Sequence, residues 1–291
     1  MTNFGNLITA AITPFDKNGI ISTDTFFRLC RKLVHDKSEA IVLTGTTGES
    51  PNLTQDDREI IYKTAKDSVG DKVKLIAGTG TYSTKESIEN SRIAEELGMD
   101  GIMIVTPYYS KPSQLGIIKH FEAINNKSNL PIMAYNIPGR TSTLIELETI
   151  ETLVNDINIH SIKDAVGDIK FSIEQIERIG DKAKIYSGDD ALTYEFVKNG
   201  AEGVVSVASH VVGKEISEMI NLLNDNKHDQ AKEIDKKIQP IFSLLFKEPS
   251  PGPVKNLLSI TWEDVGHPLL PITEISSELS LELLNNFKKI Q

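Results

Sequence analysis

A lysine ends one short apolar run of the chain, Ile159–Lys163. If this run is an extended strand, alternation places Lys163 on one face with the other odd-numbered residues and His160 on the opposite face. Lysine is rarely buried without a function, and removal from water lowers its pKa, so that more of the amine is neutral. A neutral amine at the end of a strand can attack a ketone as a nucleophile. The competing interpretation is a lysine at the rim, paired with Asp164 or Glu49.

A tyrosine and an arginine follow another apolar run, in the segment 134–141. Period-two alternation aligns Tyr135 with Met133, so the two share a face, and a phenol at the end of a strand can relay protons. Arg140 lies just beyond and is suited to binding a carboxylate through two parallel hydrogen bonds. A packed tyrosine and a solvated arginine would be the structural alternative.

Two loop motifs carry further polar groups. In Gly45-Thr46-Thr47-Gly48 the glycines allow backbone N–H groups to turn toward an anion, with hydroxyls nearby. No Gly-Lys-Ser/Thr follows, so this is not a phosphate-binding loop of the Walker type. Tyr108 and Tyr109 stand together after a proline, where they could serve a site or an interface equally well.

Short apolar runs alternate along the chain with longer amphipathic runs, which predicts strand–helix units and a parallel sheet. The predicted helices include Thr25–Val34, Asp56–Val69, Thr84–Leu97 and Leu144–Val154. The eight predicted strands are Leu7–Ile12, Ala40–Thr44, Lys74–Ala77, Gly101–Thr106, Pro131–Asn136, Ile159–Lys163, Lys184–Ser187 and Gly203–Ser206.

Eight units of similar size favour an α/β fold of the (β/α)8 TIM-barrel class. An open doubly wound sheet is the second choice, but no Gly-x-Gly-x-x-Gly follows the first run. Active sites of such barrels lie at the C-terminal ends of the strands. The lysine, tyrosine, arginine and threonines described above all stand at predicted strand ends, so the fold would bring them together.

The strand pattern stops near residue 224, so we expect a barrel domain at 1–224 and a C-terminal helical region at 225–291. Asp229–Phe246 and Ile275–Lys288 are predicted helices. The proline-rich stretch Glu248–Pro253 between them must break helix.

Composition excludes several classes of protein. The chain has 291 residues, 39% of them hydrophobic, and a net charge of -10, which argues against binding to nucleic acid or to an anionic membrane surface. A single cysteine, Cys30, allows no intrachain disulfide. We expect no signal peptide, no membrane span and a cytoplasmic location. None of the six histidines stands at a metal-binding spacing to another, so no catalytic metal is predicted.

Taken together, the motifs resemble those of the pyruvate-dependent class I aldolase superfamily and, within it, the dihydrodipicolinate synthase (4-hydroxy-tetrahydrodipicolinate synthase) family. The resemblance extends over essentially the whole chain. Four motifs carry it: Gly45-Thr46-Thr47-Gly48-Glu49-Ser50, Val105-Thr106-Pro107-Tyr108-Tyr109, Tyr135-Asn136-Ile137-Pro138-x-Arg140-Thr141 and Ile162-Lys163-Asp164-Ala165.

The resemblance implies that the protein is a lyase that condenses pyruvate with L-aspartate 4-semialdehyde, without a cofactor or metal, in lysine biosynthesis through diaminopimelate. It assigns the Schiff base to Lys163, acid–base catalysis to Tyr135, and the pyruvate carboxylate to the backbone amides of Thr46 and Thr47. The Thr46 hydroxyl would link Tyr135 to Tyr109 of a neighbouring subunit. Further substrate contacts would come from Arg140 and from the carbonyls of Gly188 and Val205.

The resemblance also implies that the active form of the protein is a homotetramer built as a dimer of dimers. Arg140 is suited to an acidic aldehyde, which favours the synthase over an N-acetylneuraminate or keto-deoxy-sugar-acid lyase on the same scaffold. A non-catalytic regulator that binds a keto acid is the third hypothesis, and the intact set of site residues speaks against it. Ser142 and Ser110 replace residues common in the family, a glycine and an asparagine, and lie outside the catalytic set.

The family resemblance also bears on inhibition by lysine, the end product. Residues matching the lysine site of regulated relatives are kept at Ser50, Glu86 and Tyr108. The chain departs at three positions, Gln55, Arg58 and Tyr82, where those relatives commonly have two histidines and an asparagine. An asparagine amide can accept a hydrogen bond from an ammonium group and donate one to a carboxylate, whereas tyrosine offers only one hydroxyl, farther from the backbone. We therefore expect lysine to inhibit weakly or not at all.

Overall fold

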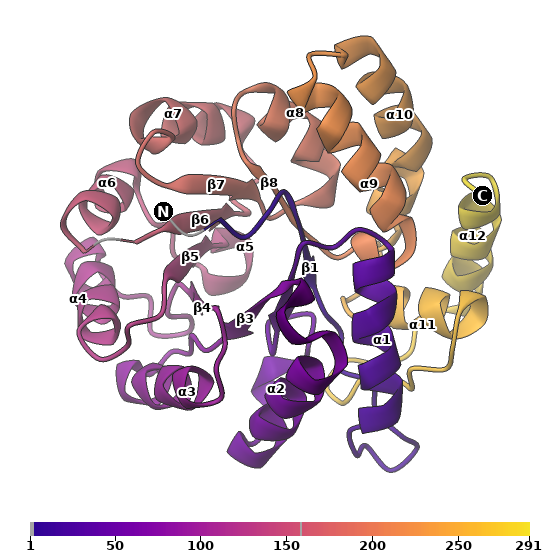
Figure 1. Ribbon diagram of the computed structural model, residues 1–291, viewed down its shortest axis with the longest axis horizontal. Helices are drawn as coiled ribbons and strands as arrows, with labels where there is room; N and C mark the ends of the chain where they lie inside the picture. Colours follow the sequence, from indigo (N-terminus) through magenta and orange to yellow (C-terminus); the bar gives the residue numbers. More distant parts are fainter. Residues whose placement is uncertain (1–2, 158) are drawn as a thin grey trace.

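A computed structural model describes residues 3–157 and 159–291. Eight parallel strands pair in chain order and close into a barrel, with the last strand beside the first (Figure 1). The predicted (β/α)8 barrel is therefore confirmed. The strands are β1 (Leu7–Ala10), β2 (Ala40–Leu43), β3 (Lys74–Gly78), β4 (Gly101–Val105), β5 (Ile132–Asn136), β6 (Ser161–Asp164), β7 (Lys184–Ser187) and β8 (Gly203–Ser206).

Helices surround the barrel; among the last three, α10 and α11 pack on α9, and α12 packs on α10 and α11 at one side of this ring (Figure 1). The α-helices are α1 (Thr23–His35), α2 (Gln55–Val69), α3 (Thr84–Glu96), α4 (Gln114–Asn125), α5 (Pro138–Thr141), α6 (Leu147–Asp156), α7 (Ile169–Ile179), α8 (Thr193–Lys198), α9 (Ser209–Asn224), α10 (His228–Leu244), α11 (Gly252–Thr261) and α12 (Ser277–Lys288). Three short 3-10 helices are η1 (Ser50–Asn52), η2 (Gly70–Lys72) and η3 (Asp190–Leu192).

Apolar side chains form two layers. One cluster lies inside the barrel and includes Met133 and Tyr135, while a larger cluster lies between the strands and the helices. Paired residues of parallel strands point to the same side, and Met133 and Tyr135 pair with Ser161 and Lys163. Lys163 therefore points into the barrel, as alternation predicts. Ile159 precedes β6 and packs in the outer cluster instead, so its predicted inward position is wrong.

Local chemistry explains where the elements begin and end. Thr44 has φ 52°, a left-handed conformation that ends β2 one residue earlier than predicted. Pro131 has no N–H to offer a ladder, and β5 begins after it. At the start of α2, Thr54 and Asp57 bond reciprocally with each other's backbone and form a capping box. Gly98, with φ 71°, follows α3, as expected of a helix-ending glycine.

The C-terminal region contains a helix that the sequence did not predict. The proline-rich stretch does interrupt the chain after α10, but α11 begins inside it, with Pro253 in the first turn. Proline is tolerated there because the first N–H groups of a helix have no partner within it. Apolar residues of α10, α11 and α12 join the outer cluster together with those of the barrel helices. The division into a barrel domain at 1–224 and a C-terminal helical region at 225–291 stays a proposal.

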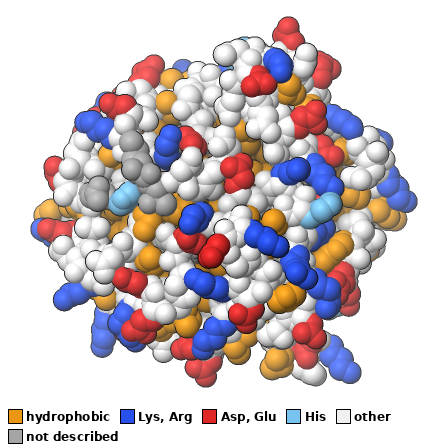
Figure 2. Space-filling view, viewed as in Figure 1, with side chains coloured by type: hydrophobic (Ala, Val, Ile, Leu, Met, Phe, Trp, Pro, Cys, Tyr) orange, Lys and Arg blue, Asp and Glu red, His pale blue; other side chains and the backbone are white. Residues whose placement is uncertain are grey.

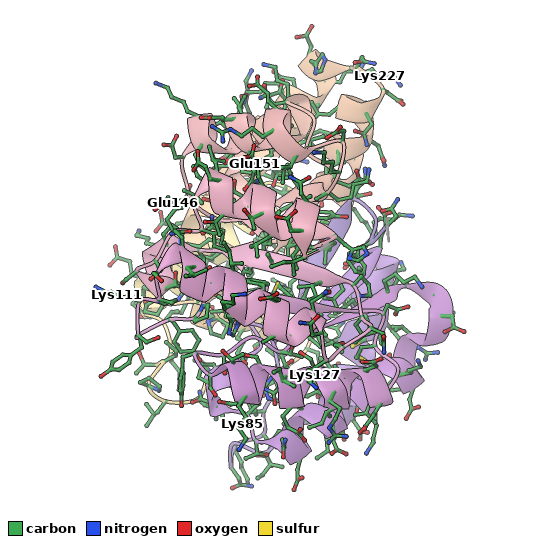
Figure 3. All side chains as sticks on the ribbon, turned by 90° about the vertical axis from the view of Figure 1, so that its left-hand side faces the viewer. Lys85, Lys111, Lys127, Glu146, Glu151 and Lys227 are labelled. Carbon is green, nitrogen blue, oxygen red and sulfur yellow. The ribbon has the colours of Figure 1, made fainter. Side chains whose placement is uncertain are left out.

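Charged side chains cover the outside. Lysine and arginine are mixed with aspartate and glutamate over the face seen in Figure 2. Side chains such as Lys85, Glu151 and Lys227 point away from the ribbon in Figure 3. No helix in the described ranges is long and apolar enough to cross a membrane.

Candidate active site

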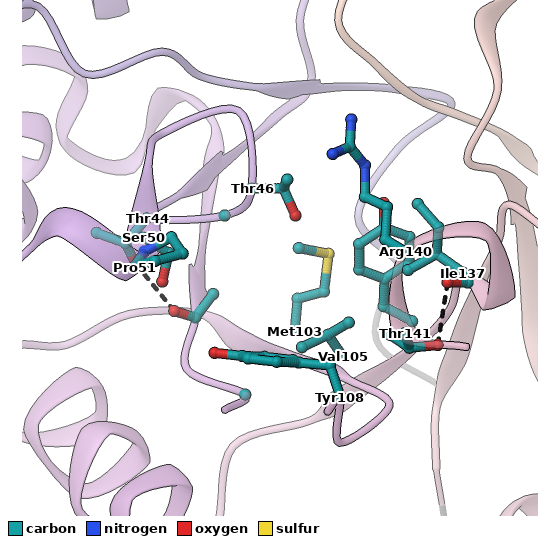
Figure 4. Close-up of a pocket in the computed structure, with 14 residues that line it drawn as sticks. Thr44, Thr46, Ser50, Pro51, Met103, Val105, Tyr108, Ile137, Arg140 and Thr141 are labelled. Carbon is teal, nitrogen blue, oxygen red and sulfur yellow. Dashed lines mark hydrogen bonds between the residues drawn. The ribbon is translucent and has the colours of Figure 1, made fainter. Parts of the chain in front are cut away.

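A pocket opens at the C-terminal ends of β2, β3, β4 and β5 and encloses about 200 Å³. This volume lies below the ~300–1,000 Å³ of pockets for drug-sized ligands, so the pocket suits a small molecule. Figure 4 shows Thr46 and Arg140 on one side of Met103 and Tyr108 on the other. The lining residues are Thr44, Gly45, Thr46, Ser50, Pro51, Gly78, Gly80, Met103, Val105, Tyr108, Tyr135, Ile137, Arg140 and Thr141.

Lys163 lies next to this lining and is 5% exposed. Its Nζ atom is 4.1 Å from the centre of the Tyr135 ring. Burial lowers the pKa of Lys163 to about 8; the charge of Asp190 opposes this effect and that of Arg140 adds to it. The alternative of a rim lysine paired with Asp164 or Glu49 is wrong.

Each of those two carboxylates has another partner. Asp164 accepts hydrogen bonds from the Val166 N–H at 2.9 Å and the Ser172 hydroxyl at 2.7 Å. Glu49 is paired with Lys255. The amine of Lys163 is therefore left without a salt bridge in the described part of the chain.

Asp190 lies close enough to Lys163 for its charge to raise the pKa of the lysine, and the sequence analysis did not identify it. It is buried at the start of η3, three residues after the end of β7, and one of its carboxylate oxygens accepts hydrogen bonds from the backbone N–H groups of Val207 and Ala208 at 3.1 and 3.0 Å. Burial raises the pKa of Asp190, and the bond from the Ser206 hydroxyl opposes that rise. The sequence signal for Asp190 is an acidic residue just beyond the end of a barrel strand. Asp189 carries the same signal, but its charge does not contribute to the pKa shift of Lys163.

Tyr135 lies at the end of β5, in the layer of side chains inside the barrel mouth. Burial raises the pKa of its phenol to about 12, while the charge of Arg140 and a hydrogen bond with Thr46 act in the opposite direction. The phenol therefore keeps its proton at neutral pH, so it can donate it and take it back. The structure thus brings Lys163, Tyr135 and Thr46 together.

The loop after β2 presents free backbone amides. In residues 3–157 and 159–291 the N–H groups of Thr46 and Thr47 donate to no other protein group. The turn is held by bonds from the Glu49 N–H to the Thr46 carbonyl at 3.1 Å and from Ser50 to Gly45 at 3.2 Å. Adjacent unpaired N–H groups are suited to binding a carboxylate.

Arg140 stands on the one-turn helix α5 and is exposed. The Thr141 hydroxyl donates to the Ile137 carbonyl at 3.0 Å and closes this turn (Figure 4). In the described residues the Arg140 side chain makes no salt bridge, so its guanidinium is available to a ligand. Ser142 ends the turn at φ 55°, a left-handed position that explains why glycine suits this place.

The two tyrosines of the β4 loop lie in different environments. Tyr108 lines the pocket and packs edge-to-face on Tyr82, with ring centres 5.6 Å apart. Tyr109 is 94% exposed and has φ 70°. A single chain therefore does not bring Tyr109 to Thr46 and Tyr135.

Gly188 and Val205 are not among the residues that line the pocket. Gly188 follows β7, and a Cβ there would lie 2.7 Å from the Ala165 side chain, so only glycine fits. Val205 is buried in β8 inside the barrel. Their contacts with substrate stay predictions. The described residues contain no group of three or more His, Cys, Asp or Glu side chains that could hold a metal ion.

Comparison with known proteins adds to this geometry. The model of the dihydrodipicolinate synthetase family matches residues 3–290. The chain is 42% identical to 4-hydroxy-tetrahydrodipicolinate synthase 1 of Halalkalibacterium halodurans, over 97% of this chain and 95% of that protein.

Two solved structures are also similar. Dihydrodipicolinate synthase of Bacillus anthracis is 41% identical, with a TM-score of 0.96 and 99% of each chain covered. The enzyme of Cyanidioschyzon merolae, solved with lysine bound, is 37% identical with a TM-score of 0.96, over 99% of this chain and 98% of that one.

Proposed function

We propose a role for each residue of this pocket from the premise that the chain belongs to the dihydrodipicolinate synthetase family. It is a lyase that condenses pyruvate with L-aspartate 4-semialdehyde to 4-hydroxy-tetrahydrodipicolinate, in the biosynthesis of lysine and diaminopimelate. The relatives favour this reaction over the sugar-acid lyase alternative. The residue roles below are our proposal.

Lys163 is the nucleophile. Its neutral amine attacks the keto carbon of pyruvate, the carbinolamine loses water, and a protonated imine forms. The backbone amides of Thr46 and Thr47 bind the pyruvate carboxylate. Support comes from the depressed pKa of Lys163 and from the two N–H groups that have no protein partner among residues 3–157 and 159–291.

Tyr135 moves the protons. Its phenol protonates the leaving hydroxyl of the carbinolamine and is then an anion that can accept protons. The hydroxyl of Thr46 connects Tyr135 to Tyr109 of a neighbouring subunit. The exposed position of Tyr109 supports this arrangement, because a partner subunit is what could cover it.

Carbon–carbon bond formation follows from the imine. The iminium is an electron sink, so the methyl group of pyruvate loses a proton and an enamine forms. The enamine attacks the aldehyde carbon while Arg140 binds the carboxylate of the semialdehyde. The amino group of the semialdehyde then adds to the imine carbon, displaces Lys163 and closes the ring. Carbonyls of Gly188 and Val205 contact the bound substrate.

One observation carries this proposal: Lys163, buried and without a salt bridge in the described chain, has its amine 4.1 Å from the ring of Tyr135. Incubation with pyruvate and borohydride should add a reduced pyruvyl group, and peptide mass mapping should place it on Lys163. Lys255, the other buried lysine, should remain unlabelled because Glu49 holds its amine. Labelling of Lys163→Ala at the wild-type level would refute the assignment.

The active assembly is a homotetramer of two tight dimers, in the cytoplasm. Exposed tyrosines at the pocket rim support an interface there, with Tyr82 59% and Tyr109 94% exposed. Sedimentation of the active enzyme tests the assembly.

Lysine inhibits this enzyme weakly. Arg58 is buried and donates to the Ser50 hydroxyl at 2.9 Å and to the Gly78 carbonyl at 3.2 Å. Ser50 is thus already occupied by a cation of the protein. Tyr82 packs on Tyr108 where regulated relatives have a smaller side chain.

A further inference from the structure

One ion pair joins the C-terminal helices to the loop after β2. Nζ of Lys255, on α11, lies 2.5 Å from a carboxylate oxygen of Glu49, and the two side chains are 1% and 2% exposed. Among the ion pairs within residues 3–157 and 159–291, no other has both side chains this deeply buried. The pair connects residues 206 positions apart.

Two further hydrogen bonds of this pair also come from the C-terminal region. The second carboxylate oxygen of Glu49 accepts a hydrogen bond from the Leu269 N–H at 2.7 Å. Lys255 also donates to the His267 carbonyl at 3.2 Å and lies over the ring of Phe15, 4.4 Å from its centre. The amine of Lys255 is therefore held by Glu49, the His267 carbonyl and the Phe15 ring, and Lys255 does not line the pocket.

Glu49 belongs to the loop that carries the free amides. It stands three positions after Thr46 and bonds back to the Thr46 carbonyl. Its φ of 59° lies in the left-handed region, which residues other than glycine rarely adopt. The carboxylate that Lys255 holds is thus connected to the Thr46–Thr47 turn through the backbone of Glu49.

Stability alone does not account for such a pair. Burying two charges costs desolvation energy that their attraction only partly returns, and apolar replacements of similar volume are often no less stable. A buried and hydrogen-bonded ion pair does, however, hold its two side chains in a fixed geometry. Here the geometry is that of the Thr46–Thr47 turn.

We propose that Lys255 is a positioning residue: through Glu49 it holds the Thr46–Thr47 amides in the orientation that binds the carboxylate of pyruvate. This inference rests on the proposed role of those amides. It gives the C-terminal helices a part in substrate binding, although none of them lines the pocket.

The test compares Lys255→Met, Glu49→Gln and the double variant with wild type. Each single variant should lower kcat/KM for pyruvate about tenfold or more. The value of kcat/KM for aspartate semialdehyde should change little, because pyruvate is by then covalently bound. The double variant, which leaves no unpaired buried charge, should regain thermal stability but not pyruvate binding. If a single variant does not fold, the double variant carries the test.

Leu283→Ala is the matched control, because Leu283 is fully buried in α12, and α12 packs mainly on α10 and α11. It should lower Tm without changing kcat/KM for pyruvate. Equal values of kcat/KM for pyruvate in wild type and the double variant would overturn the inference, and so would a parallel loss for both substrates. Failure of pyruvate and borohydride to label wild-type Lys163 would instead overturn the proposed function, and the inference with it.

Discussion

Lys163 should titrate near pH 8, about 2.5 pH units below an ordinary lysine, and this shift should govern the capture of pyruvate. Burial lowers its pKa to about 8, against 10.5 for a solvated lysine. At pH 7 an amine with a pKa of 8 is neutral in roughly one molecule in ten, and one with a pKa of 10.5 in roughly one in 3,000. At pH 7 the fold should therefore raise the fraction of neutral, reactive amine about 300-fold.

The pH dependence of kcat/KM for pyruvate measures this shift, because that quantity reports the ionisation of the free enzyme. It should rise about tenfold per pH unit up to pH 8 and level off above it. Asp190→Asn should move the midpoint to lower pH, since the negative charge of Asp190 raises the pKa of Lys163.

Asp189→Asn is the control, because the neighbouring carboxylate does not contribute to the pKa of Lys163. A midpoint near pH 10 in wild type would refute the argument that burial activates the amine. A midpoint unchanged in Asp190→Asn would refute the electrostatic part of it.

Other expectations follow from the same geometry. Tyr109→Phe should lower kcat, by roughly 10²–10⁴-fold at most, and a fully active monomer in sedimentation would contradict its role across an interface. Arg140→Ala should raise KM for aspartate semialdehyde far more than for pyruvate, since a charge-assisted contact contributes about 1.5–3 kcal/mol; equal effects would make Arg140 structural. Steady-state assays with millimolar L-lysine should show weak inhibition, because Arg58 already donates a hydrogen bond to the Ser50 hydroxyl. Near-complete inhibition by lysine at concentrations below about 1 mM, which corresponds to a binding free energy of about -4.1 kcal/mol or tighter, would refute this expectation. Burial lowers the pKa of His210 to about 4, whereas a solvated histidine has a pKa of about 6.5. Between about pH 4 and about pH 6.5 the unfolded chain therefore binds more protons than the folded chain, so Tm should fall as the pH drops through this range. His210→Gln should show a smaller fall in Tm; an equal fall would exclude His210 as its cause.

The strand pattern predicts the fold because each barrel strand is short, apolar and followed by a helix. The bounds of β7 and β8 agree with the prediction to the residue, since turns enclose both. Differences arise where one backbone angle decides the end, as at Thr44. Helix α11 escaped prediction because its first turn lies inside a run of prolines, which usually interrupts a helix, whereas proline is well tolerated at a helix start.

Strand alternation also predicts the central part of the site. It places Lys163 and Tyr135 inside the barrel from sequence alone, and the register of β5 with β6 then brings them together. Contacts between distant segments have no comparable signal. The pairing of Lys255 with Glu49 exists only once α11 has packed on the barrel. The surroundings of Tyr109 depend on a second chain, which no pattern within one chain describes.

The long separation between Glu49 and Lys255 has a consequence for biosynthesis. A ribosome adds ~5–20 residues per second, so Lys255 is made roughly 10–40 s after Glu49, given the 206 residues between them. Throughout this interval the carboxylate of Glu49 lacks its cation, even if the eight strands have already emerged. On the proposed role of Lys255, a nascent chain therefore lacks the mature orientation of its pyruvate-binding turn until α11 has been translated.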